Sequence, residues 1–128
     1  MSLKTNLQLN PNIQLNDWQT KKVFTNATLT ANAVNATVLD LGIVTQYTAV
    51  MYFGKATPVS AGDVFDILVS SDGVNYFIER SVKPVLNAVS GKYEFLYRTH
   101  NINRYVKFQN PHASNNITAM DLYATKLK

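Results

Sequence analysis

Apolar and polar residues alternate with a period of two through much of the chain, which is the spacing of a strand with one buried face. The clearest stretch, residues 63–80, places two runs of β-branched and aromatic residues on either side of Asp72-Gly73. An Asp-Gly pair between two such runs predicts a β-hairpin with a two-residue type I′ turn. Ser70, Ser71 and Asp72 are then interpreted as turn residues and not as a catalytic cluster.

Similar short runs recur along the rest of the chain, separated by turn-like breaks. They lie at residues 23–31, 37–43, 47–53, 92–98, 104–109 and 117–127. None of them shows the 3.6-residue stripe of an amphipathic helix. Short strands at this regular spacing predict an all-β fold, either an antiparallel two-sheet sandwich or a small barrel.

The first twenty residues have a different character. Their apolar side chains stand singly among Asn, Gln and Thr, and Pro11 excludes a long helix, so the segment is predicted to be extended. Two interpretations remain open: a terminus lying on its own domain, or an arm lying on a neighbouring subunit. We divide the chain into an N-terminal arm (1–20) and a β-sandwich (21–128). The predicted partner contacts are Leu3, Leu7, Leu9, Ile13, Leu15 and Trp18.

Composition narrows the class of protein. A length of 128 residues fits one domain with a real core. The absence of cysteine excludes disulfides and thiolate sites. The net charge is +4, but the basic residues are scattered, with Lys21-Lys22 the only adjacent pair, so no nucleic-acid partner is expected. No apolar run approaches the length of a membrane span, and the start lacks an apolar signal region, so we expect no membrane partner and synthesis in the cytoplasm.

The residues that carry chemistry do not form a recognisable catalytic set. His100 and His112 have no second ligand at metal-binding spacing. Asp63 and Asp66 fall on opposite faces of a strand, and Asp63 lacks the acidic neighbours of a calcium loop. No nucleophile elbow or phosphate-binding loop occurs. We therefore predict a protein that is not an enzyme and that needs no metal or cofactor.

Seven tyrosines and the single Trp18 are the remaining candidates for binding. Exposed aromatic rings stack on sugars or anchor protein interfaces, whereas aromatics on strands are most often packing residues. A carbohydrate-binding module of a phage fibre or a bacterial surface protein is therefore kept as an alternative function.

Two segments resemble known families. The segment Thr28–Gly42, with the sequence TLTANAVNATVLDLG, resembles the opening of small tailed-phage capsid decoration (cement) proteins. The hairpin Ile67–Phe77, followed by Arg104-Tyr-Val-Lys-Phe108 and then Thr118–Ala124, resembles the strand order of discoidin-like and other jelly-roll sandwiches, including modules of phage virions.

The resemblance implies a specific role. It implies a jelly-roll-like sandwich with an extended N-terminal arm, acting as a virion structural protein that binds and stabilises the major capsid lattice. The implied partners are the major capsid protein and further copies of the chain, commonly as a trimer. The implied location is the capsid surface, after synthesis in the host cytoplasm.

Overall fold

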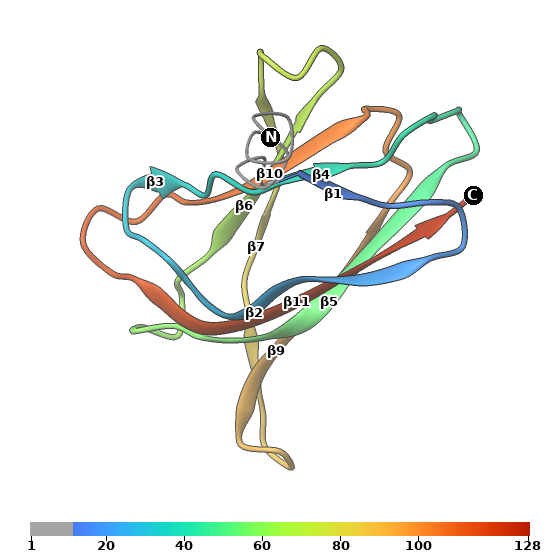
Figure 1. Ribbon diagram of the computed structural model, residues 1–128. Coiled ribbons are helices and arrows are strands. Elements are labelled where there is room, and N and C mark those ends of the chain that lie inside the picture. Colours follow the sequence, from blue (N-terminus) through green and yellow to red (C-terminus); the bar gives the residue numbers. More distant parts are fainter. Residues whose placement is uncertain (1–11) are drawn as a thin grey trace, which may run out of the picture.

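The protein is built from two β-sheets packed face to face; the structure, a computed structural model, describes residues 12–128 (Figure 1). One sheet has the order β1 (Asn12–Gln14), β4 (Val38–Asp40), β10 (Tyr105–Asn110), β6 (Phe65–Ser70) and β7 (Phe77–Val82), with β3 (Ala33–Val34) paired to β10. The other has the order β2 (Thr20–Leu29), β11 (Ile117–Leu127), β5 (Ala49–Thr57), β9 (Lys92–Thr99) and β8 (Val85–Asn87). The prediction of an all-β two-sheet sandwich is confirmed. We call these the β6 sheet and the β5 sheet.

The chain passes repeatedly from one sheet to the other. Among the described strands, β6–β7 and β8–β9 are hairpins within one sheet, and β1–β4 is the only parallel pair. The last strand, β11, lies between β2 and β5 and pairs with both in antiparallel orientation. Strands far apart in the sequence therefore hold each other in place.

An aromatic cluster joins the two sheets at the centre of the core. Phe108 of β10 meets Phe24 of β2 and Tyr52 of β5 edge to face, with ring centroids 5.5 and 5.8 Å apart. Phe65 of β6 extends the cluster to Phe95 of β9, with centroids 4.9 Å apart. Burying each such side chain stabilises the fold by roughly 1.5–3 kcal/mol.

The central hairpin forms, but its turn differs from the predicted one. Strand β6 ends at Ser70 and β7 begins at Phe77, so a longer loop replaces the two-residue turn. A type I′ turn needs positive φ at both central residues, and of Asp72 and Gly73 only Gly73 has it, at 79°. The prediction of the turn type was wrong because the Asp72 side chain organises the loop through its own hydrogen bonds.

The buried side chain of Lys126 fastens one end of the sandwich. Lys126 is only 3% exposed, and its ammonium donates hydrogen bonds to the carbonyl oxygens of Leu41 (2.6 Å) and Ile43 (2.9 Å). The same group lies 2.7 Å from the Asp17 carboxylate. All three donors of the ammonium are therefore used, and β11 is tied to the β1–β2 and β4–β5 connections.

Arg104 fastens β10 to β4 in a similar way. Its guanidinium donates two hydrogen bonds to the Asp40 carboxylate, at 2.8 and 3.0 Å. This paired contact with the arginine lowers the pKa of Asp40 below its usual range.

Gly54 is required where β5 passes a bulge in β11. The register between the two strands shifts between Thr118 and Asp121, which brings the Asp121 carbonyl group against the backbone of Gly54. A Cβ atom at position 54 would collide with that carbonyl oxygen. Because the obstacle is backbone, it cannot rotate away.

We expect Gly54→Ala to lower the free energy of unfolding by about 2 kcal/mol or more, since the strands must separate locally to admit the methyl group. Urea denaturation followed by circular dichroism measures the change. Gly62→Ala is the matched control, because a Cβ atom there meets nothing within 4 Å. Equal stability of the two variants would contradict this account of Gly54.

Candidate functional site

The predicted contact residues of the arm are placed only in part. Leu3, Leu7 and Leu9 lie outside the described residues. Ile13 lies on β1, which pairs with β4, and its side chain packs against the core. Leu15 is fully buried in that core. Residues 12–15 are therefore engaged with their own sandwich.

Trp18 differs from Ile13 and Leu15 because it is 69% exposed. Its backbone has a φ of 60°, and its N–H donates a 2.6 Å hydrogen bond to the carbonyl oxygen of Lys126. The backbone is thus fixed while the indole ring faces solvent, which is the arrangement of a side chain available to a partner.

Two of the candidate polar residues, His112 and Asp63, have structural contacts. His112 accepts hydrogen bonds at Nδ1 from the backbone N–H groups of Ser114 and Asn115, and its Nε2 lies 3.9 Å from Asp63. Asp63 also accepts a hydrogen bond from the Ser60 N–H. Within residues 12–128, no group of three or more acidic or histidine side chains is placed to hold a metal ion. No helix in that range is long and apolar enough to cross a membrane.

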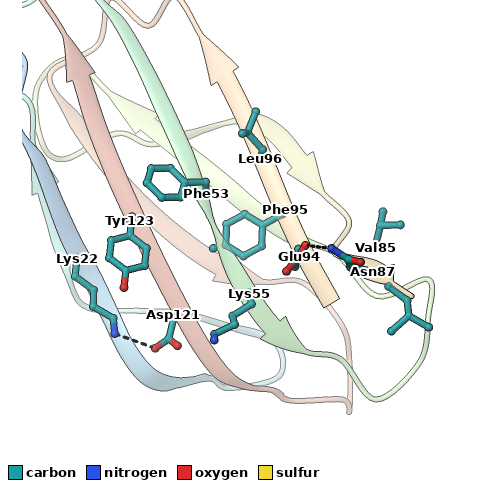
Figure 2. A pocket seen from close by; sticks show the side chains of 12 residues that line it. Lys22, Phe53, Lys55, Val85, Asn87, Glu94, Phe95, Leu96, Asp121 and Tyr123 are labelled. Atoms are coloured by element: carbon teal, nitrogen blue, oxygen red, sulfur yellow. Dashed lines mark hydrogen bonds and ion pairs between the residues drawn. The ribbon is translucent and has the colours of Figure 1, made fainter. Parts of the chain in front are cut away.

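A groove of about 810 Å³ lies on the outer face of the β5 sheet (Figure 2). Strands β2, β11, β5 and β9 form its floor, and β8 forms one side. Its lining includes Lys22, Asp121, Lys55, Glu94, Phe53 and Tyr123. We call it the outer groove.

Two cross-strand rows make up the floor of the outer groove. One row pairs Asp121 with Lys55 and Lys55 with Glu94. The adjacent row pairs Tyr123 with Phe53 and Phe53 with Leu96. Directly opposed residues on neighbouring strands have Cβ atoms within about 5.5 Å of each other, so each row acts as one surface.

Several tyrosine rings carry a basic side chain over one face. The Lys22 ammonium lies 5.4 Å from the centroid of Tyr123, whose ring also stacks on Phe53 at 5.3 Å. Arg80 covers Tyr97, Arg104 covers Tyr105 and Lys107 covers Tyr76, at 4.7–5.5 Å. These cation–π contacts make the rings parts of the surface structure and reduce the area available for stacking a ligand.

A second exposed feature lies on the side of the sandwich where β7 and β8 end their sheets. Four exposed apolar residues follow one another along these two edge strands, and we call this set the apolar edge: Phe77 (70% exposed) and Ile78 (59%) at the start of β7, and Val85 (59%) and Leu86 (52%) on β8. Only Lys83 and Pro84 separate the two strands, so the chain passes directly from the open edge of the β6 sheet to that of the β5 sheet (Figure 1). Exposed apolar side chains on an unpaired edge are typical of a surface that binds another chain.

The opposite side of the β5 sheet is built differently. The exposed residues of its edge strand β2 are all polar. They include Lys22, and Asn26, which has a φ of 47° where the pairing with β11 is irregular. Lysine and bulges protect an edge from unwanted pairing. The apolar edge is therefore better suited than the β2 edge to bind another protein chain.

No protein-family model matches the chain, and no curated protein sequence matches it significantly. The functional assignment therefore depends on the residues and geometry described above.

The Ser70–Asp72 segment has a structural role that predicts an acid response. The Asp72 carboxylate accepts hydrogen bonds from the backbone N–H groups of Asn75 and Val74, both at 2.8 Å, and from the Ser70 hydroxyl. These bonds hold the pKa of Asp72 well below its ordinary value of 3.8, and the bond from the Asn75 N–H has the largest effect. A depressed folded-state pKa adds stability above pH 4, and this stability is lost as the pH falls below that value.

We therefore expect Asp72→Asn to lower the melting temperature at pH 7 and to lower it less at pH 2, where the carboxyl group is protonated in the unfolded chain and must lose that proton when the loop forms. Thermal unfolding of both proteins at the two pH values measures the difference. A melting-temperature difference that is the same at both pH values would show that the carboxylate charge does not hold the loop.

Proposed function

We propose that this protein is a virion structural protein that binds the major capsid lattice and further copies of itself. The observation that carries the proposal is the apolar edge. Burial of side chains such as Phe77 and Ile78 against a partner stabilises a complex by up to about 1.5–3 kcal/mol each. A protein subunit with its own apolar surface is the partner that covers such an edge best.

The strand order supports the jelly-roll part of the proposal. The four strands β2, β11, β5 and β9 face β4, β10, β6 and β7, and the chain alternates between these two sets except at the β6–β7 hairpin. Eight antiparallel strands in two sheets linked by such crossings are typical of jelly rolls, which are common in viral capsids. The resemblance of segments 28–42 and 67–77 to phage virion proteins points to the same class.

The proposal includes self-association, as a trimer, on the outer surface of the capsid. A closed ring of copies uses two different patches of each subunit, one meeting the other around the ring. The apolar edge is proposed as one of these patches, and the arm with Leu3, Leu7, Leu9 and the exposed Trp18 as part of the other.

The first test replaces the apolar side chains of β7. We expect Phe77→Asp/Ile78→Asp to reduce the solution mass to that of one chain and to abolish co-sedimentation with phage heads, because charges at the interface would have to be buried. Light scattering and sedimentation measure the two effects. Both side chains are more than half exposed, so the melting temperature should change little.

The matched control for this variant is Val34→Asp/Ile43→Asp, which introduces the same charges at exposed apolar positions on β3 and in the β4–β5 connection. This control should keep the mass and the head binding of the wild type. An unchanged mass and unchanged head binding in the β7 variant would contradict the proposal.

The second test removes the arm. The deletion ends at Pro11, because Leu15 is buried in the core and Thr20 begins β2. We expect a chain starting at Asn12 to keep the far-ultraviolet circular dichroism of a β protein and to lose self-association or head binding. If the shortened chain kept both self-association and head binding, the proposal that the arm forms part of the second patch would be contradicted.

A further inference from the structure

The charged row of the outer groove crosses four strands with alternating sign. Asp121, Lys55 and Glu94 are registered neighbours on β11, β5 and β9, and the Lys22 ammonium of β2 lies 3.4 Å from Asp121 (Figure 2). Two positive and two negative groups cancel, so this row favours neither an anion nor a cation. It offers many hydrogen-bonding atoms to a ligand without net charge.

Part of this hydrogen-bonding capacity is already used, and part is free. The Glu94 oxygens accept bonds from Asn87 at 2.8 Å and Ser90 at 3.3 Å, which holds the carboxylate in place. Within the described residues, the side chain of Lys55 is exposed and its ammonium makes no hydrogen bond or ion pair. A carboxylate oxygen has more than one lone pair, and an ammonium has three donors. Acceptors in fixed positions therefore lie beside a cation that is free to donate.

The adjacent row supplies an apolar surface. Tyr123 lies between Phe53 and Lys22, so its two faces are covered. Phe53 and the 69% exposed Leu96 are the apolar groups next to the charged row. A sugar ring has an apolar C–H face and a rim of hydroxyl groups, and it matches an apolar row beside a polar one. A purely apolar ligand would leave the charges without partners.

We infer that the outer groove binds a neutral saccharide, with Lys55 donating to and Glu94 and Asp121 accepting from its hydroxyl groups. Its volume of about 810 Å³ lies in the range of small-ligand sites. Because no ring is presented as a fully open platform, the affinity should lie in the millimolar-to-micromolar range and should depend on the charged groups. This inference does not depend on the proposed virion role.

The test is a titration of the isotope-labelled full chain with short neutral oligosaccharides of gluco, xylo, manno and galacto configuration, followed by NMR. Acidic oligosaccharides are titrated in parallel. We expect shifts of backbone amides on β5, β9 and β11 with a neutral sugar. Lys55→Met keeps the aliphatic stem and removes the charged donor, so it should weaken binding roughly tenfold or more.

Lys107→Met is the matched control, because Lys107 lies on β10 in the other sheet. It should bind as the wild type does, and both variants should keep the wild-type melting temperature. The absence of shifts with every neutral sugar, a preference for acidic sugars, or equal binding by the two lysine variants would overturn the inference. Lys55→Met should self-associate as the wild type does, since the apolar residues of β7 are unchanged. Measuring its self-association therefore distinguishes a failure of sugar binding from a failure of the proposed function.

Discussion

The sandwich depends on the contact of Phe108 with aromatic rings of the opposite sheet. Phe108 comes from the β6 sheet, yet its closest aromatic neighbours include Phe24 and Tyr52 of the β5 sheet. The hydrophobic effect that drives this burial has no preferred direction, whereas the edge-to-face geometry of the rings fixes how the sheets are oriented. On the outer side of the β5 sheet, the rows of the outer groove are held in place by the registered pairing of β11, β5 and β9.

The fold class was predictable because period-two alternation is strong in the strands that have one buried face. In β10, Val106 and Phe108 are buried and Tyr105 and Lys107 are partly exposed, as the pattern indicated. The alternation carries no information on which strands pair. That β11 lies between β2 and β5 follows from pairing of residues far apart in the sequence, such as Thr125 with Thr20 and Asp121 with Lys55. The turn type failed for a local reason, since side-chain hydrogen bonds of Asp72 outweighed the preference of the Asp-Gly pair.

The candidate sites were less accessible to sequence reasoning. Lys55, Glu94 and Asp121 are separated by dozens of residues and meet only through strand register. The apolar edge was equally hidden, because Phe77 and Leu86 look like core residues until the positions of β7 and β8 at the ends of their sheets are known. Pro84 was a usable signal, since proline indicates an edge or a connection. Leu15, by contrast, looked like an arm residue and lies in the core.

The place of β11 between β2 and β5 also sets the order in which the fold can be completed during translation. Strand β2 is among the first to leave the ribosome, but among the described strands its only partner in the sheet is β11, whose pairing residues begin at Ile117. Until those residues emerge, β2 lacks the neighbour that pairs with it in its sheet. Completing the β5 sheet therefore requires the long segment between β2 and β11 to be ordered at once, which slows folding. A nascent chain stalled before β11 would be prone to pair with other chains.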